Sequence, residues 1–246
     1  MSATPGTPAS TPAYTAAAVR RAEQPLLEAG EPLMARAAAA IAQIARELVP
    51  DGRGPVLVLA GRGNNGGDAL FAAATLAEAG YAVDVLLTSD GAHSAALGAA
   101  RRAGVVCCGL DDVREAASDY RLVIDGILGI GTSSDPALRG IARATVAALA
   151  PELDRNENLR VLAVDLPSGL HPDDGTADGT VLPADVTVTM GAVKAGLVRG
   201  RGPEFTGQIV LVDLGLTPAL ERLRPEVETT APVRLLTIDA PPDQRA

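Results

Sequence analysis

The stretch Pro55-Val-Leu-Val-Leu-Ala-Gly-Arg-Gly-Asn-Asn-Gly-Gly-Asp-Ala-Leu-Phe71 reads as a strand, a turn and the start of a helix without interruption. Residues 56–60 form a short run of Val, Leu and Ala, which is typical of a parallel strand covered on both faces. Glycines at positions 61, 63, 66 and 67 then allow a sharp turn and leave main-chain N–H groups open to a ligand. Asp68 is expected to cap the following helix. Because a glycine turn at a helix N-terminus attracts anions, the stretch predicts a site for a phosphorylated small molecule.

Strand-like and helix-like segments alternate on both sides of this stretch. Before it, helices are predicted at 15–28, ended by Gly30, and at 32–48, where apolar residues recur at helical spacing. After it, the expected strands are 82–87, 105–108, 121–128, 161–164, 185–190 and 208–213, with helices at 68–78, 92–103 and 138–149. Because parallel neighbours need crossover connections, the alternation predicts an α/β fold with a mostly parallel sheet and helices on both faces.

The composition limits the class of protein. At 246 residues the chain is expected to form one domain over 14–246, with a disordered tail at 1–13 and a Pro-rich C-terminal tail. A net charge of -9 and 2% aromatic residues oppose nucleic-acid binding, which needs basic patches and stacking platforms. Since the chain has no signal-peptide pattern and no apolar run of membrane length, we expect a cytoplasmic protein that does not bind membranes. Cys107 and Cys108 are adjacent and are expected to pack at a strand end.

Two common nucleotide motifs fit the glycine turn poorly. Residues 61–66 match G-x-G-x-x-G, which alone weakly suggests a dinucleotide-dependent oxidoreductase. The acidic residue that should end the second strand is not in place, because Asp84 lies inside an apolar run. A P-loop is disfavoured because Gly67 and Asp68 stand where Lys and Ser or Thr would be needed.

Polar residues cluster where the predicted strands end. Asp125 and Asp165 each follow an apolar run, and Asn64 and Asn65 stand between glycines. A carboxylate at the end of a buried strand needs a partner, a cation or water, although each aspartate could simply cap the following loop, and the asparagines could simply form the turn. Ligands of parallel sheets lie beyond the carboxyl ends of the strands, so these residues together indicate a working site.

Four motifs, in this order, resemble the NAD(P)H-hydrate epimerase family. They are Gly61-Arg62-Gly63-Asn64-Asn65-Gly66-Gly67-Asp68, Val123-Ile124-Asp125-Gly126-Ile127-Leu128-Gly129-Ile130-Gly131, Asp165-Leu166-Pro167-Ser168-Gly169 and Gly191-Ala192-Val193-Lys194-Ala195-Gly196-Leu197. The resemblance covers residues 15–216. It implies a Rossmann-like three-layer αβα sandwich with two N-terminal helices, and an enzyme that interconverts the R and S epimers of NADHX and NADPHX, the hydrated nicotinamide cofactors.

The resemblance also implies the site and the partners. Substrate contacts are expected from Asn64, Asn65, Gly66, Gly67, Asp68, Gly129, Ile130, Gly131, Thr132, Ser133, Ser134, Asp135 and Asp165. A potassium ion (K+) is expected among Asn65, Asp125 and Ser168, whose oxygens suit a hard cation. The family implies a homodimer and a separate ADP- or ATP-dependent NAD(P)H-hydrate dehydratase as functional partner. Lys194 matches a family lysine, and an exposed surface lysine is an equal interpretation.

Asp165 is the expected proton-transfer residue. Inversion at C6 of the ring requires the hydroxyl to leave and water to return on the other face, or the ring to open and reclose, and both routes move protons. The two histidines, His93 and His171, stand in polar loop-like segments and are assigned no role. Ala35 and Arg36 replace a Glu-Asn pair of many relatives, which leaves the role of that pair in doubt. A non-catalytic module of the same fold, binding a nucleotide or a partner, is the alternative function.

Overall fold

The computed structural model describes residues 10–50, 52, 54–131 and 135–238. The helices are α1 (Ala16–Glu28), α2 (Leu33–Leu48), α3 (Asn64–Glu78), α4 (Ser94–Arg102), α5 (Leu110–Ala116), α6 (Gly140–Arg155), α7 (Ala195–Val198), α8 (Gly202–Phe205) and α9 (Thr217–Leu220). The strands are β1 (Thr11–Tyr14), β2 (Val56–Ala60), β3 (Val83–Leu87), β4 (Val106–Cys108), β5 (Leu122–Gly126), β6 (Arg160–Val164), β7 (Val186–Met190), β8 (Val193–Lys194), β9 (Gln208–Asp213), β10 (Val227–Thr229) and β11 (Val233–Thr237).

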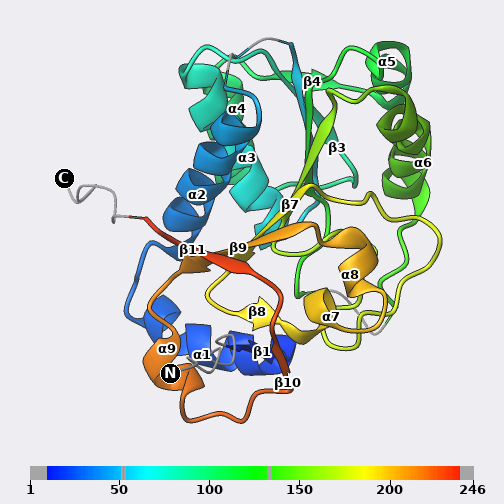
Figure 1. Cartoon of the computed structure of the whole chain (residues 1–246). Coiled ribbons are helices and arrows are strands. Elements are labelled where there is room, and N and C mark those ends of the chain that lie inside the picture. Colours follow the sequence, from blue (N-terminus) through cyan, green and yellow to red (C-terminus); the bar gives the residue numbers. More distant parts are fainter. Residues whose placement is uncertain (1–9, 51, 53, 132–134, 239–246) are drawn as a thin grey trace, which may run out of the picture.

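An eight-stranded sheet with the order β11-β9-β7-β6-β5-β2-β3-β4 forms the middle layer, and every pairing in it is parallel. Helices α2, α3 and α4 cover one face, and α5 and α6 cover the other (Figure 1). The predicted three-layer α/β fold is confirmed. Because the chain builds outward from β2 in one direction and from β5 in the other, these two neighbours mark the switch point at which parallel sheets bind ligands.

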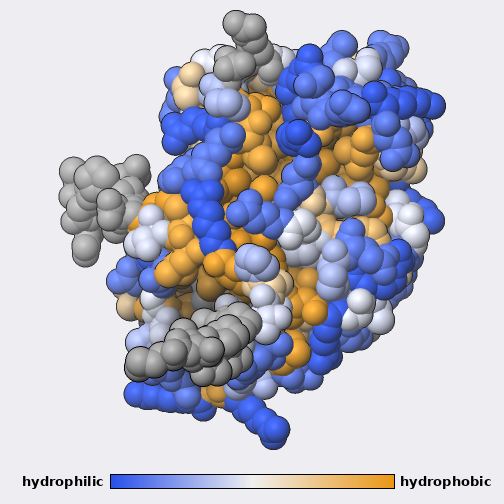
Figure 2. Space-filling view, viewed as in Figure 1, coloured by the Kyte–Doolittle hydropathy of each residue, from blue (hydrophilic) through white to orange (hydrophobic). Residues whose placement is uncertain are grey.

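The central strands are apolar because both of their faces are covered. Every residue of β2, β5 and β7 is buried. The continuous apolar run of β2 predicts this, whereas β7 alternates Val and Thr and buries both threonines. One core cluster lies between the sheet and α2, α3 and α4, and a second lies under α5 and α6. In the space-filling view, hydrophobic residues show through the middle of the face and hydrophilic residues dominate its rim (Figure 2).

A second, three-stranded sheet corrects the predicted N-terminal tail. Strand β1 lies between β10 and β8, with Tyr14 opposite Lys194, and Ala13 and Tyr14 are buried. The prediction of a disordered tail is therefore wrong for residues 11–13, while residues 1–9 lie outside the described residues. At the other end, β11 pairs with β9 and adds a last strand to the large sheet that was not predicted, while the Pro-rich residues 239–246 lie outside the described residues. Strands β1 and β11 are short, and they form because residues far away in the chain pair with them.

Three local predictions are also corrected. Helix α3 begins at Asn64 with Gly63 as its N-cap, so Asp68 does not cap it and lies in the second turn. Helix α5 was not foreseen; its short run packs Val113 under the sheet. Cys107 is exposed on the edge strand β4 rather than packed.

Within the described residues, no helix is long and apolar enough to cross a membrane.

Candidate active site

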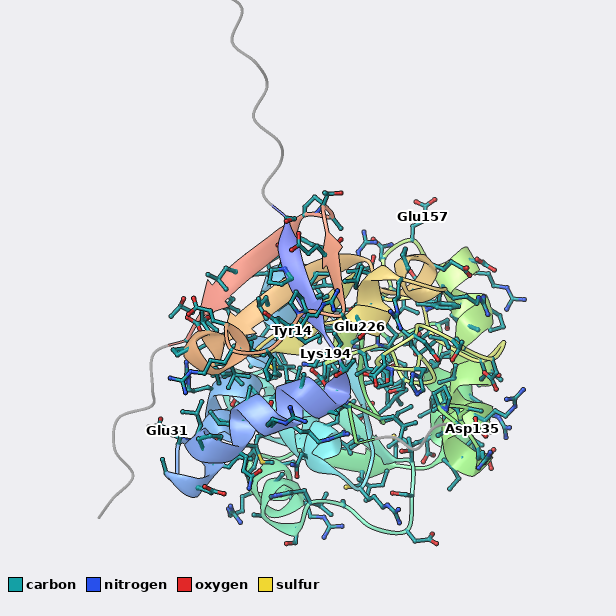
Figure 3. The ribbon with its side chains drawn as sticks, turned by 90° about the horizontal axis from the view of Figure 1, so that it is seen from below. Tyr14, Glu31, Asp135, Glu157, Lys194 and Glu226 are labelled. Atoms are coloured by element: carbon teal, nitrogen blue, oxygen red, sulfur yellow. The ribbon has the colours of Figure 1, made fainter. Side chains whose placement is uncertain are left out.

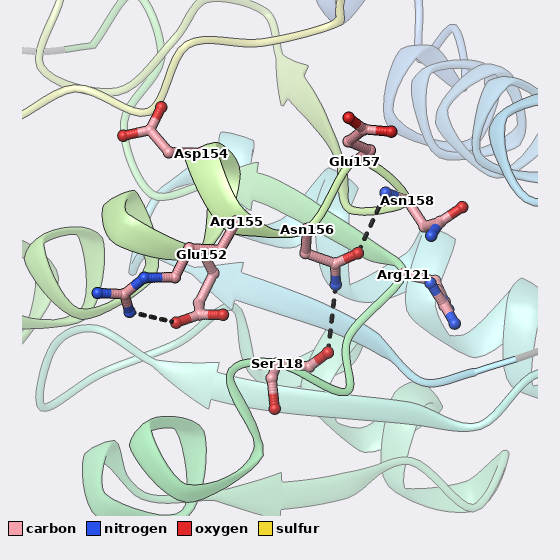
Figure 4. Close-up of a pocket in the computed structure, with 8 residues that line it drawn as sticks. All are labelled: Ser118, Arg121, Glu152, Asp154, Arg155, Asn156, Glu157 and Asn158. Atoms are coloured by element: carbon pink, nitrogen blue, oxygen red, sulfur yellow. Dashed lines mark hydrogen bonds and ion pairs between the residues drawn. The ribbon is translucent and has the colours of Figure 1, made fainter.

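A cavity of about 1050 Å³ opens beyond the carboxyl ends of β2, β5 and β6. Its walls come from the glycine turn, from the loop after β5, from the end of β6 and from the two N-terminal helices. Its lining includes Arg20, Glu23, Arg62, Gly63, Asn65, Asp68, Gly129, Asp165 and Met190. A polar hollow of about 540 Å³ lies at the opposite, amino edge of the sheet, where Asn156 donates a hydrogen bond to the Ser118 carbonyl and Arg155 pairs with Glu152 (Figure 4). Because sheet ligands gather at the carboxyl edge, the larger cavity is the candidate site.

The glycine turn brings the backbone very close to its neighbours. A Cβ atom on Gly61 would lie 1.9 Å from the Ile127 carbonyl oxygen, and one on Gly66 would lie 1.9 Å from the Gly61 carbonyl oxygen. No described atom lies within 4 Å of a Cβ built on Gly63, which faces the cavity at the start of α3. The first N–H groups of a helix have no partners within it, so the mouth of the cavity offers an anion site.

Asp125, at the end of β5, is only 1% exposed and accepts three hydrogen bonds. The Ser168 hydroxyl donates to its Oδ1 at 2.6 Å, the Ser168 N–H donates to its Oδ2 at 2.8 Å, and the Ile127 N–H donates to Oδ1 at 3.3 Å. Burial raises the pKa of Asp125, and the hydrogen bonds from Ser168 oppose that rise. This network ties the loop after β5 to the loop after β6.

Asn65 supplies the third group of the expected cation set. Its side chain is buried against Gly129, where an added Cβ would lie 3.0 Å from the amide oxygen. Its amide nitrogen has no hydrogen-bond partner among the described residues. Because a buried amide needs partners at both ends, and because a half-turn exchanges the nitrogen and the oxygen, the side chain can present an oxygen to a cation. Among the described residues, no group of three or more His, Cys, Asp and Glu side chains could hold a metal.

Asp165 forms a buried ion pair with Lys194. The two residues are 7% and 0% exposed, and the Lys194 ammonium donates to the carboxylate of Asp165. The ammonium also donates to the Met190 carbonyl at 2.8 Å and to the Thr189 hydroxyl at 3.2 Å, so all three of its protons have acceptors. The interpretation of Lys194 as an exposed surface residue is therefore wrong.

The backbone at Asp165 has an unusual conformation. Its φ angle is +69°, the one positive value among the described residues other than glycine. Asp and Asn tolerate this left-handed region better than other side chains, although it still costs of the order of 1 kcal/mol. The main-chain N–H of Asp165 donates to the Val188 carbonyl at 2.7 Å. The loop is thus held by the neighbouring strand in a conformation that aims the carboxylate at the cavity.

Two further carboxyl groups line the cavity beside this pair. Burial raises the pKa of Asp68 well above its ordinary value, and the negative charges of Asp165 and Glu23 add to that rise. Burial also raises the pKa of Glu23, where the charge of Lys194 acts against the rise and the charge of Asp165 adds to it. The sequence prediction missed Glu23. The signal that could have found it is its helical spacing, because Glu23 lies seven residues after Ala16 and four after Val19, which are both buried in α1.

Eight of the predicted site residues line the cavity, and the other described ones do not. Lining the cavity are Asn64, Asn65, Asp68, Gly129, Ile130, Gly131, Asp135 and Asp165. Gly66 and Gly67 do not line it: Gly66 packs on Gly61, and a Cβ on Gly67 would lie 3.1 Å from the His93 ring. Asp125 and Ser168 lie beneath the wall. Thr132, Ser133 and Ser134 fall outside the described residues.

Two residues without an assigned role, Arg36 and His93, have structural roles. Arg36, from the replaced pair, donates to the Asp213 carbonyl at 2.6 Å and ties α2 to the end of β9. The imidazole of His93 accepts the Ala96 N–H at 3.3 Å and caps α4. Both residues thus act on the frame around the cavity.

The chain is similar to known proteins in sequence and in fold. The family model described as YjeF-related protein N-terminus matches residues 30–196. Two relatives, each called NAD(P)H-hydrate epimerase, come from Microbacterium testaceum (59% identical, over 87% of this chain and 83% of the relative) and Clavibacter michiganensis (52%, over 82% and 90%). A Mycobacterium tuberculosis protein called bifunctional NAD(P)H-hydrate repair enzyme Nnr is 39% identical over 82% of this chain and 41% of its own length. The crystal structure of yeast ynu0 superposes with a TM-score of 0.65 at 22% identity, over 75% of this chain and 82% of that one, and supports the fold.

Proposed function

Since the chain belongs to the YjeF-related protein N-terminus family, we propose that it is an NAD(P)H-hydrate epimerase whose chemistry centres on Asp165. The substrate is NADHX or NADPHX, which carries a hydroxyl group at C6 of the reduced nicotinamide ring. The enzyme interconverts the R and S epimers at that carbon, and no hydride moves. The observation that carries the role of Asp165 is its buried pair with Lys194 at the wall of the cavity.

The ion pair suits Asp165 to act as a base. The Lys194 ammonium donates to the carboxylate and fixes its position at the cavity wall, and a buried carboxylate without such a partner would be unfavourable. When the C6 hydroxyl leaves, the ring carbon becomes planar and water can add to either face. Asp165 takes the proton from the water that adds, and in the reverse direction it returns that proton to the leaving hydroxyl.

The glycine turn supplies the means of holding the rest of the substrate. The pyrophosphate lies at the start of α3, where main-chain N–H groups and the helix dipole favour negative charge. Arg62 lines the same mouth and adds a positive charge. The nicotinamide end then extends toward Asp165.

A potassium ion would be held by Asp125, Ser168 and Asn65. The fit rests on a buried carboxylate, a hydroxyl group and an amide with one unpartnered end. Bound there, the ion would balance the buried charge of Asp125 and hold the loops that carry Gly129 and Asp165. We also propose that the chain works as a homodimer in the cytoplasm and supplies one epimer to a separate NAD(P)H-hydrate dehydratase, as the bifunctional relatives suggest.

The deciding experiment follows the conversion of one pure epimer of NADPHX into the other, with the uncatalysed rate subtracted at the same pH. The wild-type chain is expected to accelerate the conversion, and Asp165→Asn to lower its rate by roughly a hundredfold or more. Asn tolerates the positive φ angle, so the substitution keeps the backbone. A wild-type chain that binds the substrate without interconverting the epimers would instead be a non-catalytic module.

A further inference from the structure

Helix α1 lines the cavity at the carboxyl edge of the large sheet, together with Asp165. Figure 3 shows α1 crossing the view from below, with Lys194 beside the start of the helix. Three contacts hold it: β1, which precedes it, pairs Tyr14 with Lys194, the Ala16 N–H donates to Asp173 at 2.6 Å, and Arg20 donates to the Ile130 carbonyl. The cavity is therefore lined by α1 as well as by the end of β6.

Glu23 lies beside the buried face of α1. Ala16, Val19 and Ala22 form that buried face, and position 23 lies four residues after Val19, next to Ala22. The half-buried carboxyl group of Glu23 lines the cavity together with Asp165. A partly buried carboxyl group in a cleft beside a second carboxyl group is a candidate for proton transfer.

We propose that Glu23 is a second catalytic residue, which delivers a proton to the hydroxyl group on the face of the ring opposite Asp165. The proposal rests on the proposed epimerase function. Asp165, paired with Lys194, is suited to take a proton from water, so a different group must protonate the departing hydroxyl. Burial raises the pKa of Glu23, which keeps its proton available to a higher pH.

The step balances with water as the only other reactant. The C6–O bond breaks as the hydroxyl takes the proton of Glu23 and leaves as water, while the lone pair of the ring nitrogen forms a double bond to C6. A water molecule then adds to C6 from the other face and gives its proton to Asp165. One proton has passed from Glu23 to Asp165, and exchange with solvent restores both groups. The opposite epimer reacts by the same route with the roles exchanged.

The charged groups around Glu23 come from four elements. Lys194 on β8 and Arg20 on α1 favour its ionised form, while Asp165 after β6 disfavours it. The charge of Glu23 in turn raises the pKa of Asp68 on α3. The cavity therefore contains three carboxyl groups, at positions 23, 68 and 165, beside the ammonium of Lys194. Such crowding is an arrangement in which one carboxyl group stays protonated while its neighbour is ionised.

The test compares Glu23→Gln with Glu28→Gln, a matched change at an exposed position of the same helix. Glu23→Gln is expected to lower kcat by about a hundredfold or more with KM nearly unchanged, and Glu28→Gln to match the wild-type chain. Glu23→Asp, which keeps an acid, should retain more activity than Glu23→Gln. Thermal melting and stabilisation by ADP-ribose report on folding and binding in every variant.

The outcomes separate the two proposals. If the wild-type chain and Glu28→Gln interconvert the epimers and Glu23→Gln does so within threefold of them, Glu23 has no part in proton transfer. A Glu23→Gln chain that has lost ADP-ribose stabilisation together with activity would make Glu23 a binding residue and also overturn the inference. Inactivity of the wild-type chain itself would count against the proposed function rather than against Glu23.

Discussion

The ammonium group of Lys194 donates a hydrogen bond to the carboxylate of Asp165, and both side chains are buried at the carboxyl edge of the sheet. The two residues are 29 positions apart in the chain and come together because β8 follows the strand that neighbours β6. Lys194 also belongs to the small sheet through its register with Tyr14. The contact between Lys194 and Asp165 therefore links the candidate base, at the end of β6, to the small sheet and to β1, which leads into α1.

Lys194→Met should destabilise the fold by about 3–5 kcal/mol, because it leaves the carboxylate of Asp165 buried without a partner. A chain of this size loses about 2–4 °C of melting temperature per kcal/mol, so thermal melting measures the effect. The exposed pair of Arg234 and Glu47 is the control, and Arg234→Ala should cost about 1 kcal/mol or less. Adding Asp165→Asn to Lys194→Met should recover part of the loss; failure to recover any would show that the buried charge is not its cause.

Asp68→Asn should stabilise the protein at neutral pH and have little effect near pH 4. An unfolded carboxyl group titrates near pH 4, and the pKa of Asp68 in the folded state is raised above that value, mainly by burial. Between the two values the folded state binds more protons, so the free energy of unfolding falls as pH rises through this window. Melting temperatures of the variant and the wild type across pH 4–8 test the sign. A variant less stable at pH 7 than at pH 4, relative to the wild type, would contradict it.

Gly63→Val should abolish the rise in melting temperature that ADP-ribose gives the wild-type chain, since binding to the native state alone shifts the unfolding equilibrium. The added side chain points into open space, so the melting temperature without ligand should fall only by the cost of a poorer N-cap for α3, about 1 kcal/mol. Gly66→Val should lower it more, because its Cβ meets the backbone of Gly61. Gly91→Val, also in open space but outside the cavity wall, is the control. An undiminished shift in Gly63→Val would place the phosphates elsewhere.

Potassium chloride should raise the melting temperature more than an equal concentration of tetramethylammonium chloride, which is too large for the site. Ser168→Ala should reduce this difference, because it removes one oxygen ligand and the hydroxyl group that bonds to Asp125. Ser118→Ala, at the distant amino-edge hollow, should leave the difference intact. Equal melting temperatures of the wild-type chain in the two salts would argue against a cation at Asn65, Asp125 and Ser168.

Local patterns in the sequence predict most strands of the large sheet. The apolar runs of β2, β5 and β9 and the apolar stripe of α2 were predicted correctly, because a buried strand or helix face must be apolar wherever it lies. The glycine turn was located, yet the start of α3 was placed four residues late at Asp68 instead of Asn64. Asparagines and glycines can form a turn or the first turn of a helix, and local propensity does not choose between them.

The sequence by itself determined the three-layer fold, the edge of the sheet at which the site lies and the positions of Asp125 and Asp165 at strand ends, since each follows from the periodicity of nearby residues. Only the tertiary structure decided what these carboxyl groups touch. It buried Lys194 against Asp165, linked Ser168 to Asp125 and brought Glu23 of α1 over the cavity. Such contacts depend on strand order, backbone conformation and crossing connections, which set distances between residues far apart in the chain and leave no trace in the local pattern.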